Sequence, residues 1–219
     1  MKEKFHQLLE NIKKDLIFLG NEVEHNIRQS IRALEKQDVQ LAQQIIDSDK
    51  GIDQMEVKIE DNILTLLALQ QPVAIDLRFI VGGLKMNNDL ERIGDHAVNI
   101  AQTVSKLAGK KPLPSFKLFP EMSDIACRML HEAVNAFIHQ DAELARNVCG
   151  RDNVVDDYYD KVIAETISFL KKDSAKLEQG FLAARIARSL ERVGDLATNI
   201  GEDVVFMKEA KIIRHQLEG

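Results

Sequence analysis

Paired carboxylates at helical spacing are the residues of this sequence best suited to chemistry. Asp49 and Asp53 lie four residues apart, as do Glu91 and Asp95. Four residues make about one helical turn, so each pair would project from one face of a helix. Like charges at this spacing repel each other, and a bound cation would reverse that penalty. Carboxylates without thiol or imidazole ligands favour hard, oxygen-preferring metal ions.

The pattern returns in the second half of the chain. The phrase Leu90-Glu91-Arg92-Ile93-Gly94-Asp95 recurs 100 residues later as Leu190-Glu191-Arg192-Val193-Gly194-Asp195. A repeat at about half the chain length indicates that a domain-like unit has been duplicated. We therefore predict two related metal sites, one formed by Asp49, Asp53, Glu91 and Asp95 and the other by Asp152, Asp156, Glu191 and Asp195.

Four neighbouring residues are expected to support these ligands from outside: Asn99, Asn199, Arg92 and Arg192. The asparagines lie one helical turn beyond the second acid of each motif, whereas the two arginines could instead neutralise the acids. The alternative is that each acidic stripe is a solvated helix face on a metal-free helical scaffold. The spacing does not specify the metal, and iron, Mg²⁺, Mn²⁺ or Ca²⁺ would each accept these oxygen ligands.

Two further features lie inside the repeated phrase. Gly94 and Gly194 occur within predicted helices, where glycine costs about 1 kcal/mol relative to alanine, so they are expected to allow close approach of another helix. His96 follows Asp95, but its counterpart is Leu196. We therefore expect His96 to be a surface residue and not a metal ligand.

Six long helical segments can be traced from apolar residues repeated every three or four positions. They span about Phe5 to Lys36, Asp38 to Gln70, Pro72 to Leu107, Glu121 to His139, Asp141 to Lys171 and Ala175 to Lys211. Short loops between long helices imply antiparallel neighbours. The sequence thus predicts an all-α fold of two tandem, sequence-related three-helix bundles.

Three of the four prolines fall between residues 112 and 120, which marks this stretch as the connection between the repeats. We predict a first three-helix repeat over residues 1–108, a linker over 109–120 and a second repeat over 121–219. Gln37-Asp38 recurs 103 residues later as Gln140-Asp141, and Asp38 is expected to be the N-cap of the second helix. Because the acidic phrase recurs after only 100 residues, the connection between the fifth and sixth helices is expected to be the shorter one.

Composition restricts the partners and the compartment. A net charge of −6 argues against nucleic-acid binding, which normally needs a basic surface. No apolar run reaches the ~20 residues that span a bilayer, and the N-terminus lacks the apolar stretch of a signal peptide. Cys127 and Cys149 fit no metal or redox spacing, which indicates reduced thiols. A cytoplasmic protein without direct membrane insertion is expected.

The sequence resembles the PhoU family of bacterial phosphate-signalling regulators. The resemblance is carried by Leu67-Ala68-Leu69-Gln70-Gln71-Pro72-Val73-Ala74-Ile75-Asp76-Leu77-Arg78, followed by Asp89-Leu90-Glu91-Arg92-Ile93-Gly94-Asp95. The second half departs from this pattern: Phe169-Leu170-Lys171-Lys172-Asp173 replaces the Gln-Gln-Pro phrase, and Ser189 replaces Asp89. The second metal site could therefore differ in occupancy.

The resemblance implies two three-helix bundles that bind multinuclear metal clusters, iron foremost, through the eight acidic residues named above. It also implies a homodimer that is not an enzyme. Such a protein negatively regulates phosphate uptake and phosphate-starvation signalling by contacting the ATPase subunit of a phosphate ABC transporter and a sensor histidine kinase. Membrane association would then be peripheral, at the inner face, through the transporter. The competing interpretation is a carboxylate-bridged metal-storage bundle.

Overall fold

The computed structural model describes residues 2–210, and all of their regular secondary structure is helical. The elements are α1 (Lys2–Lys36), α2 (Val39–Gln70), α3 (Ala74–Leu107), the 3-10 turn η1 (Pro114–Leu118), α4 (Phe119–His139), α5 (Ala142–Cys149), α6 (Asp152–Leu170), the 3-10 turn η2 (Ser174–Lys176) and α7 (Leu177–Glu209). The predicted all-α fold of two three-helix bundles is confirmed. Of the predicted repeats, residue 1 and residues 211–219 lie outside the described residues.

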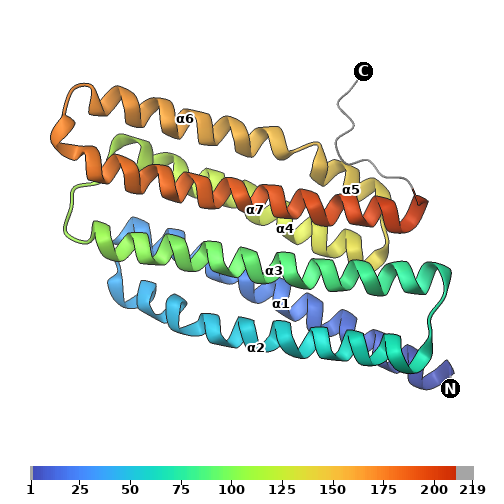
Figure 1. Ribbon diagram of the computed structural model, residues 1–219. Coiled ribbons are helices and arrows are strands. Elements are labelled where there is room, and N and C mark those ends of the chain that lie inside the picture. The colour runs from blue at the N-terminus through green and yellow to red at the C-terminus, as the bar shows by residue number, and fades with distance from the viewer. Residues whose placement is uncertain (1, 211–219) are drawn as a thin grey trace.

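The two bundles lie side by side along their whole length (Figure 1). Helices α1, α2 and α3 pack on one another, and α7 packs on α4, α5 and α6. The bundles meet through α3 against α7 and α1 against α4. Lys85 of α3 pairs with Asp203 of α7 at 3.2 Å, and Asn99 of α3 accepts from Arg185 of α7 at 3.4 Å. From the first pair to the second, the residue number rises along α3 and falls along α7, so the two helices are antiparallel.

The duplicated Gln-Asp phrase, Gln37-Asp38 and Gln140-Asp141, connects the first two helices of each repeat. Gln37 and Gln140 end α1 and α4 with left-handed backbone, at φ 52° and 54°. The following aspartates begin the next helices: Asp38 accepts from the backbone N–H of Leu41 at 2.9 Å, and Asp141 accepts from that of Leu144 at 3.0 Å. Side-chain acceptance of a free helical N–H is the N-cap that Asp38 was predicted to provide.

The second repeat departs from prediction in its middle. The segment predicted as one helix from Asp141 to Lys171 is interrupted at Gly150 and Arg151, which separate α5 from α6. The connection between α6 and α7 spans residues 171–176, longer than the 71–73 connection between α2 and α3. The expected shorter connection was therefore wrong: the residues missing from the repeat come from the helix ends, not from the loop.

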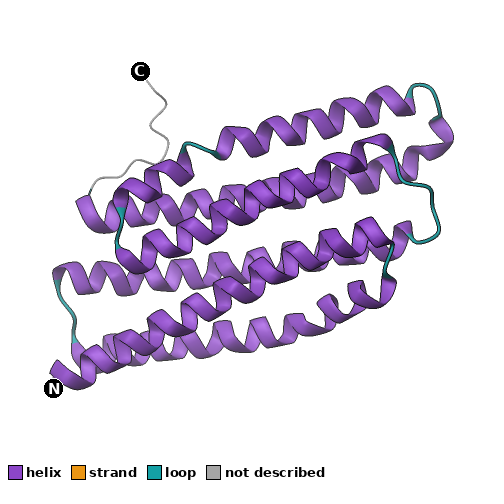
Figure 2. Cartoon of the chain, turned by 180° about the vertical axis from the view of Figure 1, so that it is seen from behind, coloured by secondary structure: helices purple, strands orange, loops and turns teal. Residues whose placement is uncertain are grey.

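The apolar side chains that repeat every three or four positions fill the interior, as the sequence predicted. Leu90, Ile93 and Ile100 of α3 are buried, as are the equivalent Leu190, Val193 and Ile200 of α7. Loops gather at the two ends of the molecule, apart from the interruption between α5 and α6 (Figure 2). None of the helices among residues 2–210 is long and apolar enough to cross a membrane.

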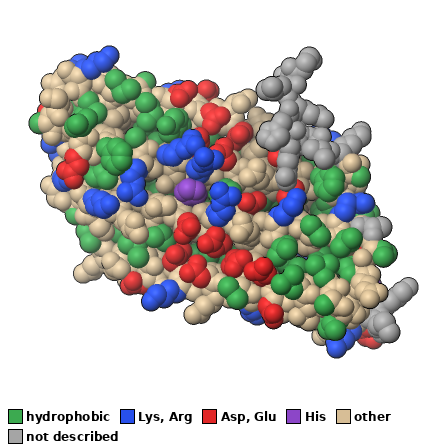
Figure 3. Space-filling view, viewed as in Figure 1, with side chains coloured by type: hydrophobic (Ala, Val, Ile, Leu, Met, Phe, Trp, Pro, Cys, Tyr) green, Lys and Arg blue, Asp and Glu red, His purple; other side chains and the backbone are tan. Residues whose placement is uncertain are grey.

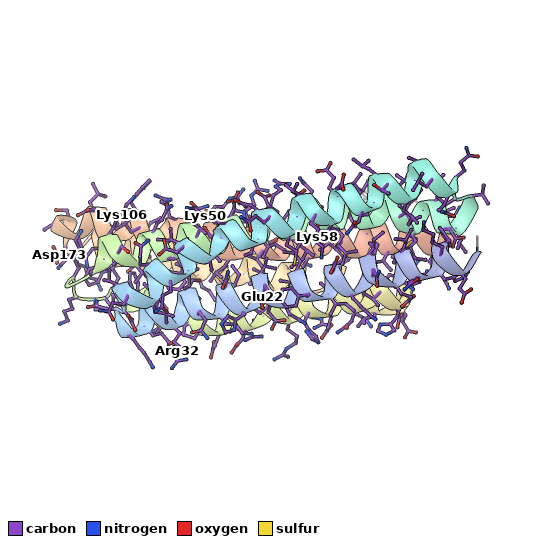
Figure 4. All side chains as sticks on the ribbon, turned by 90° about the horizontal axis from the view of Figure 1, so that it is seen from below. Glu22, Arg32, Lys50, Lys58, Lys106 and Asp173 are labelled. Carbon is purple, nitrogen blue, oxygen red and sulfur yellow. The ribbon has the colours of Figure 1, made fainter. Side chains whose placement is uncertain are left out.

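The view from below shows α1 and α2 running side by side, with Lys50 and Lys58 along α2 (Figure 4). Lys106 at the end of α3 and Asp173 in the α6–α7 connection lie at the same end of the molecule (Figure 4). Of the predicted metal ligands, Asp49, Asp53, Glu91 and Asp95 lie well inside α2 and α3, whereas Asp152 is the first residue of α6.

Candidate metal centre

The first acidic cluster consists of Asp49 and Asp53 of α2 with Glu91 and Asp95 of α3. Asp49 and Glu91 are half-buried, whereas Asp53 and Asp95 are exposed. The pKa of Asp49 is raised first by burial and then by the charges of Asp53 and Asp95. Since Asp95 belongs to the neighbouring helix, carboxylates of α2 and α3 lie close enough to repel one another.

Glu91 lies at the centre of this cluster. Burial raises its pKa most, followed by the charges of Asp95, Asp53, Glu56 and Asp49. Glu56, one turn beyond Asp53, also has a raised pKa, through burial and the charges of Glu60 and Asp53. All these neighbouring charges destabilise the ionised form of the carboxyl they act on. A cation placed among them would be strongly attracted.

The second cluster repeats the arrangement with Asp152 and Asp156 of α6 and Glu191 and Asp195 of α7. Burial, then the charges of Asp156 and Asp195, raises the pKa of Asp152 to about 6. The pKa of Asp156 is raised by burial and then by Asp195. Burial and Asp195 also raise the pKa of Glu191, but here Arg188 and Arg192 act in the opposite direction.

The glycines of the repeated phrase set the distance between the helices. A Cβ atom at Gly94 would lie 3.2 Å from Cγ2 of Ile52 on α2, and one at Gly194 would lie 3.4 Å from both methyl groups of Val155 on α6. The contact at Gly94 is tighter than an ordinary van der Waals contact, whereas the one at Gly194 is of ordinary length. The predicted close helix packing at both glycines is confirmed, and it brings the carboxylates of paired helices together.

The four predicted supporting residues behave differently from one another. Arg192 reaches a predicted ligand, with its Nη1 3.0 Å from Oδ2 of Asp195. Arg92 instead lies 3.9 Å from Oδ1 of Asp89. Asn99 accepts a hydrogen bond from Arg185 of α7. Asn199 lines a cavity of about 490 Å³ between α3 and α7, together with Leu84, Lys85, Asn88, Asp89, Glu202 and Asp203.

His96 is not the surface residue that the sequence predicted. Its ring is half-buried, and its Nδ1 is buried without a hydrogen-bond partner. Burial, then the charges of Arg192, Arg92 and Arg188, lowers its pKa to about 4, so the ring is neutral at pH 7. Arginines of both repeats therefore converge where α3 meets α7. Figure 3 shows basic side chains beside a histidine, between two groups of acidic ones.

Sequence reasoning missed Arg188, whose guanidinium forms an ion pair with Glu191. The available signal was a difference between the repeats, because Asn88 occupies the equivalent position. Searching for shared residues alone could not reveal it.

The donor set fits a hard cation, although the side chains stand apart. Carboxylate oxygens are the ligands that iron, Mn²⁺, Mg²⁺ and Ca²⁺ accept. Oε2 of Glu191 is buried without a hydrogen-bond partner, and a cation would satisfy it. Among residues 2–210, no three carboxylate, imidazole or thiol groups converge closely enough to hold an ion as they stand. Like charges repel, and the carboxylates would have to rotate toward one another to enclose one.

Comparison with known proteins places this arrangement in a family. The model of the PhoU domain matches residues 16–104 and again residues 119–204. A curated relative from Clostridium acetobutylicum, a phosphate-specific transport system accessory protein PhoU homolog, is 35% identical over 94% of this chain and 95% of its own. The Escherichia coli protein, named phosphate-specific transport system accessory protein PhoU, is 30% identical over 97% of this chain and 88% of its own.

Solved structures agree with the sequence relatives. The crystal structure of PhoU from Pseudomonas aeruginosa superposes with a TM-score of 0.90 at 33% identity, covering 94% of this chain and all of that one. PhoU from Streptococcus pneumoniae, a phosphate transport system regulatory protein, superposes with a TM-score of 0.89 at 30% identity, covering 95% of this chain and 99% of that one. Repeat, fold and relatives agree, and the chain belongs to the PhoU family.

Proposed function

We propose that this protein is a non-enzymatic negative regulator of phosphate uptake and of phosphate-starvation signalling. A role in phosphate transport regulation follows from the family and from the names of relatives that match nearly the whole chain. The finer proposal is that it acts by contact with the ATPase subunit of a phosphate ABC transporter and with a sensor histidine kinase. It would work as a homodimer in the cytoplasm, reaching the membrane through the transporter.

The observation that carries the metal part of the proposal is the repetition of one arrangement in two places. In each repeat, two carboxylates from one helix face two from its antiparallel neighbour, and burial and mutual repulsion raise the pKa of several of them. An acidic stripe that was merely solvated would not need two helices to present it in register. We propose a multinuclear cation site at each cluster, occupied by iron or by Mn²⁺, Mg²⁺ or Ca²⁺.

A bound cation would neutralise the repelling carboxylates of a cluster. The chain's own residues do the rest: α2 and α3 each supply one acidic pair to the first cluster, and α6 and α7 do so for the second. Gly94 and Gly194, which lack a side chain, allow the helices of each pair to pack against one another at these points. Occupancy would therefore change how firmly neighbouring helices are held together, and a contact surface on those helices could respond to it.

Exposed apolar side chains offer a surface for protein contacts. Those at or near the α2–α3 turn are Leu64, Leu69, Val73, Ile75, Leu77 and Val81. Figure 3 shows apolar side chains gathered over this end, with a second group over the α6–α7 end. Exposed apolar patches rimmed by polar residues mark interaction sites. We propose the α2–α3 end as the partner surface, since it contains the Leu-Gln-Gln-Pro phrase on which the resemblance rests.

The competing storage or di-iron bundle is less well supported. Ferritin-like sites place Glu-x-x-His motifs inside a four-helix core. Three residues after Glu91 and Glu191 this chain has Gly94 and Gly194, and Asp53, Asp95 and Asp156 of the clusters are exposed. An oxidase or storage core needs all of its ligands enclosed, whereas three of these eight carboxylates are exposed.

Deletion of the gene tests the regulatory proposal. We expect a phosphate-starvation promoter reporter to be derepressed in phosphate-replete cells, and the wild-type gene to restore repression. Normal reporter activity together with normal phosphate uptake in the deletion strain would show that this chain serves another function.

A further inference from the structure

The two acidic clusters differ in the positive charge attached to them. In the second repeat, Arg188 forms an ion pair with Glu191, and Arg192 lies 3.0 Å from Asp195. Both acids are predicted metal ligands. Each arginine stands three residues before its partner on α7, so the helix itself holds the pairs together.

The first repeat lacks both of these ion pairs. Asn88 occupies the position of Arg188 and is exposed. Arg92 is retained, but it lies 3.9 Å from Asp89, a residue that Ser189 replaces in the second repeat. Among residues 2–210, no cationic side chain forms an ion pair with Asp49, Asp53, Glu91 or Asp95. Two differences between the repeats, at positions 88 and 89, thus redirect the arginines toward the second cluster.

The burial of each partner shows which side of these pairs can move. The side chain of Glu191 is 12% exposed, whereas those of Arg188 and Arg192 are 48% and 45% exposed. Oε2 of Glu191 remains buried without a hydrogen-bond partner. The arginines can swing into solvent while the carboxylate stays in place, as exchange of an arginine for an incoming cation would require.

We propose that Arg188 and Arg192 are built-in competitors for the second acidic cluster, which make it the weaker of two cation sites. The second cluster then fills only at cation concentrations above those that fill the first. This inference rests on the proposed cation sites and adds an order of occupancy to them. The physical reason is that a cation at the second cluster must displace two ion pairs, whereas a cation at the first cluster relieves uncompensated repulsion.

Titration of the full chain with Mn²⁺ by calorimetry, after removal of bound metal, tests the order. Asp49→Asn/Asp95→Asn leaves only the second cluster, and Asp152→Asn/Asp195→Asn leaves only the first. We expect the first cluster to bind Mn²⁺ roughly tenfold more tightly, the scale expected when two partly screened like charges lie beside one site and not the other.

Substitution of Arg188 tests whether the arginines cause the weaker binding at the second cluster. In the background that retains only the second cluster, Arg188→Asn should strengthen Mn²⁺ binding about tenfold. Adding Ser189→Asp, which recreates the counterpart of Asp89, should strengthen it further by drawing Arg192 away. Arg32→Asn removes the same charge from an exposed position on α1 and should change nothing (Figure 4).

The reciprocal exchange Asn88→Arg, made where only the first cluster remains, should weaken binding there. This exchange keeps the inference testable if circular dichroism shows that Arg188→Asn does not fold. Equal affinities at the two clusters, or no effect of either exchange, would overturn the inference and leave the cation sites standing. No Mn²⁺ binding to any protein, wild type included, would overturn the inference together with the metal part of the proposed function. The deletion reporter tests the regulatory part separately.

Discussion

A Cβ atom at Gly94 of α3 would lie 3.2 Å from Cγ2 and 3.3 Å from Cδ1 of Ile52 on α2. Gly94 is three residues after Glu91 and directly before Asp95, and Ile52 lies directly before Asp53. A tight contact between these two helices therefore falls within the acidic cluster. The packing of Gly94 against Ile52 sets how closely the carboxylates of α2 and α3 can approach.

Gly94→Ala and Gly51→Ala should have opposite effects on stability. Nothing lies within 4 Å of a Cβ at Gly51, which is exposed on α2. There, alanine should raise the free energy of unfolding by ~0.5–1 kcal/mol through helix propensity. At Gly94, the clash with Ile52 should outweigh the gain in helix propensity, so alanine should lower the free energy of unfolding by about 1 kcal/mol. Urea unfolding measures both, and similar gains at the two positions would show that the α2–α3 contact is not tight.

Asp152 should make the metal-free protein less stable as the pH rises. Its pKa is about 6 in the folded state, above the 3.8 of an unperturbed aspartate. Between these two values the folded state binds more protons than the unfolded state, so the free energy of unfolding falls with rising pH. The contribution is fully unfavourable above pH 6 and absent below pH 4.

Asp152→Asn should therefore stabilise the chelator-treated protein at pH 7.5, by about 1 kcal/mol after allowance for screening by solvent. At pH 4 the same change should have almost no effect. Asp157→Asn, at an exposed position on the same helix, is the matched control and should show no such pH dependence. Denaturant unfolding at both pH values measures the difference, and an equal effect at each pH would contradict the assigned origin.

Much of the arrangement could be predicted from the sequence because it is local. The N-cap at Asp38 depends only on an aspartate before an apolar run, and the buried ridge of Leu90, Ile93 and Ile100 depends only on helical period. The acidic pairs share a helix face for the same reason. Duplication then extended each prediction to the second repeat.

The contact between α3 and α7 could not be predicted in this way. An apolar helix face does not specify which helix of another repeat will cover it. His96 was expected at the surface because Leu196 is its counterpart, yet α7 half-buries it beside Arg188 and Arg192. The break at Gly150 and Arg151 was missed as well, since a single glycine within a helical pattern is normally tolerated.

Glu91→Gln/Glu191→Gln should lower the metal content of the protein purified without chelator. Each substitution keeps the side-chain shape while removing a charge from the centre of a cluster, so the attraction for a cation falls. Glu35→Gln, at an exposed position one residue before the end of α1, removes a charge close to the loops and serves as the control. Elemental analysis provides the measurement. Equal metal content in the double variant, the control and the wild type would remove support for the cation sites.

The apolar α2–α3 end should be needed for repression of phosphate-starvation genes. Leu69 and Val73 are 63% and 74% exposed and contribute little to the core, so Leu69→Glu/Val73→Glu should fold normally. Two charges in the middle of an apolar contact must be desolvated without partners, which costs several kcal/mol and prevents docking. In a deletion strain, this variant should leave the starvation reporter derepressed at high phosphate.

The other apolar end provides the control for this prediction. Leu177 and Phe181, at the start of α7, are 67% and 66% exposed, so Leu177→Glu/Phe181→Glu introduces the same charges at equally exposed positions. If the α2–α3 end is the partner surface, this second variant should restore repression while the first does not. Repression by both would remove the α2–α3 end from consideration, and loss of repression by both would mean that docking uses the whole length of the bundle.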